Sequence, residues 1–226
     1  MWRDARMVAA KDLRIEWRSR VVVNQVVPFA AVVLLLFAFA GEPDSGFLRR
    51  LAPGLFWIAV LLSALVVLQR SFALEMADGG RDALRVAGVE PAAVFVGKAI
   101  AVGAVLVVLE AALALGVTIL YDASLTRALP LVLVTCLLAT LGVVAPGLIL
   151  GALASGLRVR ETLLPLLFLP VVAPVMIGAT RSFEVALATD EGPLGEGWRW
   201  CGLLGLFALA YTALGVVLFE PLLEDS

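Results

Sequence analysis

The sequence predicts an all-α integral membrane protein whose helices cross the bilayer. Of the 226 residues, 62% are hydrophobic and only 16% are charged, and a water-soluble core cannot absorb so many apolar side chains. Stretches 26–41, 51–68 and 128–157 contain no charged residue. Since about 20 apolar residues cross ~30 Å of hydrocarbon as a helix, these stretches predict transmembrane helices.

Six apolar segments predict six transmembrane helices, and the short loops between them leave a single transmembrane domain over residues 1–226. The segments are 21–40, 52–73, 99–121, 128–154, 163–180 and 199–219. The fifth carries Pro165, Pro170 and Pro174, and each proline removes a helix hydrogen bond. Segment 163–180 can therefore be a kinked span, a broken span or a re-entrant segment.

Lys and Arg are concentrated in one set of alternating flanks, which predicts the orientation. The richer set has twelve: Arg3, Arg6, Lys11, Arg14, Arg18, Arg20, Arg70, Arg81, Arg85, Lys98, Arg158 and Arg160. The poorer set has five: Arg49, Arg50, Arg127, Arg181 and Arg199. Because cytoplasmic loops carry the excess of basic residues, we expect the amino terminus, and with six crossings also the carboxyl terminus, in the cytoplasm.

The first 20 residues, called the arm below, predict an amphipathic helix. Charged residues alternate there with apolar ones, and the apolar side chains recur at nearly helical spacing. The apolar positions are Trp2, Ala5, Ala9, Leu13 and Trp17. This pattern is typical of a helix in the membrane surface, with tryptophans at headgroup level.

The loop 75–98 is expected on the cytoplasmic side and predicts a short helix. Gly79 and Gly80 open a turn, residues 81–87 can form two helical turns, and Gly88 can end them. Pro91 suits the first turn of the next helix. This short helix can be a docking surface for a cytosolic protein, or the loop can be merely solvated.

Two further features lie inside the predicted spans. Glu110 is a carboxyl at membrane depth, where it must face the bundle, carry a proton or serve a transport path, so a structural and a functional role are both open. Gly147, Gly151 and Ser155 recur every four residues, which predicts close approach of another helix. That helix can belong to this chain or to a second copy.

Several chemistries are excluded by what the sequence lacks. It has no histidine, the usual metal ligand and general base, and Cys136 and Cys201 fall in predicted spans as small hydrophobic residues. A phosphate loop ending at Gly97-Lys98 would need glycine at position 92, which is alanine. The sequence has no basic domain, so it does not predict nucleic acid binding. If ATP drives this protein, another chain must bind it.

Two stretches resemble a known family. They are K-D-L-R-I-E-W-R-S-R at 11–20, and the loop residues Glu75, Asp78, Gly79, Asp82, Leu84, Gly97 and Lys98. Together with the length and the six-span layout, they resemble CcmB, the permease subunit of the haem exporter-type ABC transporter of bacterial cytochrome c maturation. The loop alone would also suit the wider class of ABC-2-type exporters.

The resemblance implies a non-catalytic subunit of the bacterial inner membrane. Its implied partners are a CcmA-like ATPase, a second copy of the permease, CcmC- and CcmD-like membrane proteins and a CcmE-like haem chaperone, so that ATP and haem are held by other chains. The residues that would couple to the ATPase are Lys11, Asp12, Glu16, Arg18, Glu75, Asp78, Arg81, Asp82 and Arg85.

Three other functions compete with this hypothesis. An ABC-2-type exporter would carry another substrate, such as a lipid or a drug. A scaffold would only assemble other membrane proteins. An intramembrane enzyme would use Glu110, with Asp122 near the span end as its candidate companion, although no second catalytic group accompanies Glu110 at a useful spacing.

Overall fold

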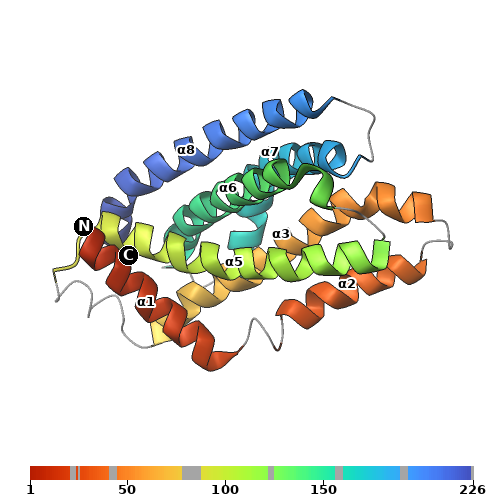
Figure 1. Cartoon of the computed structure of the whole chain (residues 1–226). Coiled ribbons are helices and arrows are strands. Elements are labelled where there is room, and N and C mark those ends of the chain that lie inside the picture. Colours follow the sequence, from red (N-terminus) through yellow and green to blue (C-terminus); the bar gives the residue numbers. More distant parts are fainter. Residues whose placement is uncertain are drawn as a thin grey trace.

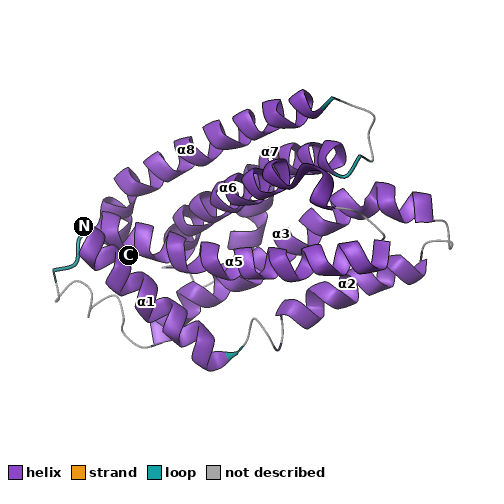
Figure 2. Cartoon of the chain, viewed as in Figure 1, coloured by secondary structure: helices purple, strands orange, loops and turns teal. Residues whose placement is uncertain are grey.

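The structure, a computed structural model, describes residues 1–20, 24, 26–40, 45–77, 88–121, 125–155, 160–188 and 193–224. Every regular element in these ranges is a helix (Figure 2). In chain order they are α1 (Trp2–Ser19), α2 (Val27–Ala40), α3 (Ser45–Ala77), α5 (Pro91–Tyr121), the 3₁₀ helix η2 (Leu125–Ala128), α6 (Leu129–Ser155), α7 (Arg160–Ala186) and α8 (Leu194–Glu224).

Within the described ranges, five helical stretches are long and apolar enough to cross a membrane. They are Gly46–Ala73, Pro91–Tyr121, Leu125–Ala154, Thr162–Ala186 and Leu194–Phe219. The described part of the predicted first span, 21–40, includes the 14-residue helix α2, which at 1.5 Å per residue is about 21 Å long. Since α2 is shorter than the hydrocarbon is thick, helix length accounts for five of the six predicted spans.

The observed helices extend beyond several predicted spans. The segment predicted at 52–73 lies within α3, the segment at 99–121 begins eight residues late relative to α5, and the segment at 199–219 lies within α8. Hydropathy marks only the apolar part of a helix, whereas backbone hydrogen bonding continues into the polar flanks. The predicted bounds therefore locate these helices but understate their lengths.

The proline-rich segment forms one continuous helix. α7 holds Pro165, Pro170 and Pro174 in its interior, and 25 of its residues form a stretch of membrane-spanning length. Val172, Val175 and Ala179 on this helix are fully buried. The broken-span alternative for 163–180 is therefore wrong, because packed neighbours accommodate the prolines within one helix, whereas a full crossing of this segment stays a prediction.

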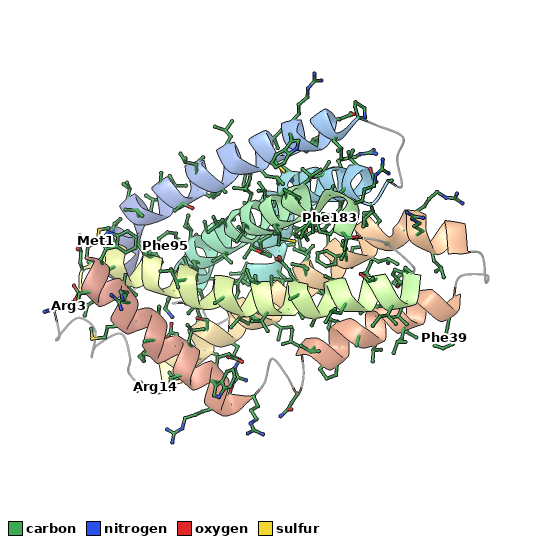
Figure 3. The ribbon with its side chains drawn as sticks, in the orientation of Figure 1. Met1, Arg3, Arg14, Phe39, Phe95 and Phe183 are labelled. Carbon is green, nitrogen blue, oxygen red and sulfur yellow. The ribbon has the colours of Figure 1, made fainter. Side chains whose placement is uncertain are left out.

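The long helices form a bundle, defined here as α3 and α5–α8, with α6 packed against α3, α5, α7 and α8. Both ends of the chain lie at one end of this bundle (Figure 1). Two aromatic clusters fill its interior, with Phe95 against Phe219 and, in the other half, Phe183 against Phe56 and Trp57 (Figure 3). The side chains of both clusters are buried, so they contribute to the packing of α3, α5, α7 and α8.

The glycines of α6 lie where other helices of the same chain come close. A Cβ on Gly147 would overlap Leu68 of α3 and press on Phe168 of α7, and a Cβ on Gly151 would overlap the Phe72 ring of α3. Ser155 ends α6. Gly147 and Gly151 are therefore packed against this chain's own α3, which decides between the two alternatives open from the sequence.

A Gly151→Ala substitution should destabilise the fold, because the buried Phe72 ring would have to move to admit a methyl group. We expect a loss of about 1–3 kcal/mol, typical of overpacking. Gly202→Ala in α8 is the matched control, since nothing lies within 4 Å of a Cβ there and alanine favours helix by about 1 kcal/mol. Thermal unfolding in detergent should lower the midpoint for Gly151→Ala alone, and equal midpoints would contradict the tight contact.

Candidate functional site at the junction of arm and bundle

The arm packs against the start of α5 through small side chains. The arm residues Ala5, Val8 and Ala9 are buried in this contact. A Cβ on Gly97 of α5 would lie 2.7 Å from the backbone oxygen of Ala5 and equally close to Val8. Only glycine fits at position 97 without moving the arm, so the two helices touch nearly backbone to backbone.

The predicted apolar stripe of the arm is divided between two environments. Ala5 and Ala9 face α5, whereas the side chains of Trp2 and Trp17 are 67% and 83% exposed. Figure 1 shows the reason, because α1 begins beside the start of α5 and runs at an angle to it, so that its second half moves away from α5. The helix predicted for the arm is present as α1, and its location in the membrane surface stays a prediction.

Lys98 joins the arm to the bundle and is only 2% exposed. Its Nζ lies 3.5 Å from Oδ2 of Asp12 in α1 and 3.4 Å from Oγ of Ser71 in α3. The same ammonium stands 5.4 Å from the centre of the Phe72 ring. A buried charge is tolerated only with such partners, so this contact ties α1, α3 and α5 together.

Two further ion pairs hold the arm near its two ends. Glu16 Oε2 lies 3.4 Å from Nε of Arg70 in α3, and the amino group of Met1 lies 3.4 Å from Oε2 of Glu90, just before α5. The Arg70–Glu16 pair is largely shielded from solvent. Together with the pair of Lys98 and Asp12, these pairs form what is called the junction below, and they connect the arm to α3 and to the start of α5.

The predicted coupling residues of the arm therefore fall into two groups. Asp12 and Glu16 turn toward the bundle, whereas Lys11 and Arg18 are exposed. Lys11 Nζ lies 3.2 Å from Oδ1 of Asp12. A docking protein would meet the exposed cations and not the two carboxylates.

Most of the predicted loop site lies outside the described residues. This holds for the backbone of Asp78, Arg81, Asp82 and Arg85, for the predicted short helix 81–87, and for the side chain of Glu75, whose backbone is in α3. Two flanking predictions can be checked. Gly88 has a φ of +64°, which suits glycine at the end of a turn, and Pro91 is the first residue of α5.

Glu110 of α5 connects this helix to α6 through a hydrogen bond. Its side chain is 3% exposed, and Oε1 accepts a 2.6 Å hydrogen bond from the Thr140 hydroxyl. Cys136 of α6 lies beside the same carboxyl. Oε2 has no hydrogen-bond partner among the described residues, and Asp122, proposed as a companion, lies outside them.

A second polar cluster was not predicted from the sequence. The Thr135 and Ser182 hydroxyl oxygens are 2.6 Å apart, and Thr135 Oγ1 is 3.2 Å from the sulfur of Cys201. The cluster joins α6, α7 and α8 and is buried. Hydroxyls in apolar helices can also bond the backbone of their own helix, as Thr135 does to the Leu131 carbonyl at 2.8 Å. A Thr or Ser in an apolar segment therefore does not by itself predict a contact between helices.

The described residues contain no cluster of three His, Cys, Asp or Glu side chains that could hold a metal ion. The structure contains several apolar helices of membrane-spanning length, with hydrogen bonds between their buried side chains. Ion pairs connect the charged arm to two of these helices, α3 and α5. This combination defines a multi-pass helical membrane protein.

The chain belongs to the CcmB protein family, whose pattern matches residues 3–219. It is 29% identical over 217 residues to the heme exporter protein B of Pseudomonas aeruginosa, covering 93% of each chain. The protein of that name from Escherichia coli K12 is 32% identical over 82% of each chain, and that of Haemophilus influenzae is 30% identical over 79% of this chain and 80% of its own. The family predicted from the arm and the loop is confirmed.

Weakening the pairing of the buried ammonium should loosen the arm. Asp12→Asn replaces the carboxylate 3.5 Å from the Lys98 Nζ by a neutral amide, and we expect a loss of about 3 kcal/mol, as for other weakened buried pairs. Adding Lys98→Met to Asp12→Asn should restore much of this stability, because no buried ammonium then has to be stabilised. Unfolding in detergent and protease cleavage of the arm would measure both effects.

Lys11→Met is the matched control, because this exposed lysine pairs with the same carboxylate and should contribute at most about 1 kcal/mol. Equal effects of Lys11→Met and Asp12→Asn would contradict the special role of the buried lysine.

Thr140→Val should destabilise the contact between α5 and α6, since it removes the hydroxyl that donates to Glu110. We expect about 1–3 kcal/mol, the range for a buried polar group deprived of its partner. Thr118→Val is the control, because the Thr118 hydroxyl is exposed and, among the described residues, donates only to the Ala114 carbonyl of its own helix. If the two variants unfold at the same temperature, Glu110 and Thr140 do not form the proposed tie.

Proposed function

We propose that this chain is the permease subunit of an ABC transporter complex in cytochrome c maturation. In this role it couples ATP hydrolysis on a separate ATPase to haem export or to release of a haem-loaded chaperone. Support comes from its family and from relatives named heme exporter protein B that match most of its length. The chain itself is non-catalytic in this proposal.

The junction carries the mechanical part of the proposal. A subunit that transmits force needs a firm path from its cytoplasmic surface to its spans, and the arm offers one through Asp12–Lys98 and Glu16–Arg70. A push on the arm or on the loop 78–87 would then tilt α3 and α5 together. Such motion between two packed arrangements is typical of bundles that switch.

The proposed topology has six crossings of the bacterial inner membrane, with both termini in the cytoplasm. Two observations support it: both chain ends lie at one end of the bundle, and the flanks that the sequence predicts on the cytoplasmic side carry twelve basic residues against five. α2 would complete the first crossing together with residues that precede it. The arm would lie in the membrane surface, where the exposed Trp2 and Trp17 suit the headgroup level.

The proposed complex holds two copies of this permease, a CcmA-like ATPase that binds ATP, and CcmC- and CcmD-like membrane proteins. Haem would be handled by these partners and by a CcmE-like chaperone, because this sequence has no histidine to ligate it. The loop residues Glu75, Asp78, Arg81, Asp82 and Arg85, with Lys11 and Arg18 of the arm, would face the ATPase.

Charge reversal in the loop tests the coupling. Asp82→Arg or Arg85→Glu should lower the ATPase activity of the purified complex severalfold while the chain still inserts and assembles, because the docking charges no longer match their partner. Arg127→Glu, at the opposite end of the bundle, is the control and should leave the activity unchanged. Unchanged activity in both loop variants would refute the coupling role.

Deletion of the gene distinguishes the substrates. Loss of c-type cytochromes, restored by the wild-type chain, is expected for this proposal. Normal cytochromes would instead favour an ABC-2-type exporter of a lipid or drug. If no ATP-hydrolysing subunit co-purifies with the chain, a scaffold role would replace the permease role.

A further inference from the structure

A groove of 480 Å³ lies where the second half of the arm departs from α5. Its arm side is formed by Leu13, Glu16, Trp17 and Arg20, with Asn24 following. Its α5 side is apolar and is formed by Ala104, Val105 and Val108. One wall therefore carries charged and aromatic side chains, and the other is purely hydrocarbon. A phospholipid has the same two parts, a charged headgroup and apolar acyl chains.

The charge of the groove is positive. Its one carboxylate, Glu16, is compensated by Arg70, 3.4 Å away. Arg20 is exposed at the groove, and no ion pair of Arg20 occurs in the part of the chain that the structure describes. Arg14 and Arg18 add exposed positive charge on the same arm. An anionic headgroup is attracted here, whereas the cationic amine of a zwitterionic one is repelled.

The backbone at Arg20 makes a matched variant available. This residue ends α1 in the left-handed conformation, with φ +52°, where glycine is favoured, and its backbone N–H bonds the Glu16 carbonyl. Arg20 and Asn24 both line the groove, and the backbone N–H of Asn24 donates to the Arg20 carbonyl at 2.8 Å.

We infer that this groove binds a phospholipid with a net negative headgroup. The phosphate lies at Arg20 and Asn24, the Trp17 ring borders the glycerol region, and one acyl chain runs along Ala104, Val105 and Val108. The lipid fills the groove that the angled arm leaves open between itself and α5. The inference rests on the arm lying in the membrane surface, as proposed above, but not on the substrate or the ATPase.

Quenching of Trp17 fluorescence by brominated lipids tests this site in the full chain reconstituted into vesicles. The Trp17 signal is the difference between wild type and Trp17→Phe. Brominated phosphatidylglycerol, in a phosphatidylcholine background, should quench it at about fivefold lower mole fraction than brominated phosphatidylcholine does, the preference that about 1 kcal/mol per arginine provides. Arg20→Gly should abolish this preference without harming the fold, since glycine suits the left-handed backbone.

Two variants control the interpretation. Arg14→Ala removes an equal charge from the arm outside the groove and should keep most of the preference, whereas Ala104→Phe fills the groove and should reduce quenching by both lipids. Equal quenching by the two lipids, or equal loss in Arg14→Ala and Arg20→Gly, would overturn the site. No quenching by either lipid would overturn it together with the surface location of the arm, while leaving the transport function untouched.

Discussion

The buried ammonium of Lys98 is the contact on which the organisation of this end of the protein depends. A lysine removed from water must find partners, and those it finds belong to the arm and to α3. Its neighbour Gly97 lets the arm approach α5 closely enough for the pairing. Two adjacent residues thus convert a surface helix into a fixed part of the bundle, and the ion pair of Glu16 with Arg70 extends the attachment along the arm.

Deeper in the bundle, a few hydrogen bonds likewise connect one helix to the next. Glu110 with Thr140 joins α5 to α6, Thr135 with Ser182 joins α6 to α7, and the Tyr121 hydroxyl donates to the Leu34 carbonyl of α2 at 2.7 Å. Apolar side chains gain little by leaving lipid for one another, so close packing and hydrogen bonds must select one arrangement. Gly147 and Gly151 allow close packing of α6 on its neighbours, and these few hydrogen bonds fix which side chains of neighbouring helices face each other.

Much of the fold follows from hydropathy, because long apolar runs such as 128–157 have few alternatives to crossing a bilayer. The family also follows from the sequence, since its motifs lie in the arm and the loop. Periodicity could not show that α1 meets α5 at an angle, so that Ala5 is buried and Trp17 is exposed. It also could not show that Asp12 and Glu16 form ion pairs with residues of α5 and α3. Those outcomes depend on side chains far apart in sequence, such as Lys98, and only the assembled helices bring them together.

A distance measurement between spin labels on the arm and on α5 tests the central claim, that the two move as one body. Labels at the exposed positions 14 and 107 would be compared in the assembled transporter, nucleotide-free and nucleotide-trapped. A single narrow distance distribution that is the same in both states is predicted. A distribution that shifts or broadens between the states would show that the arm moves independently, and Lys98 would then not transmit force.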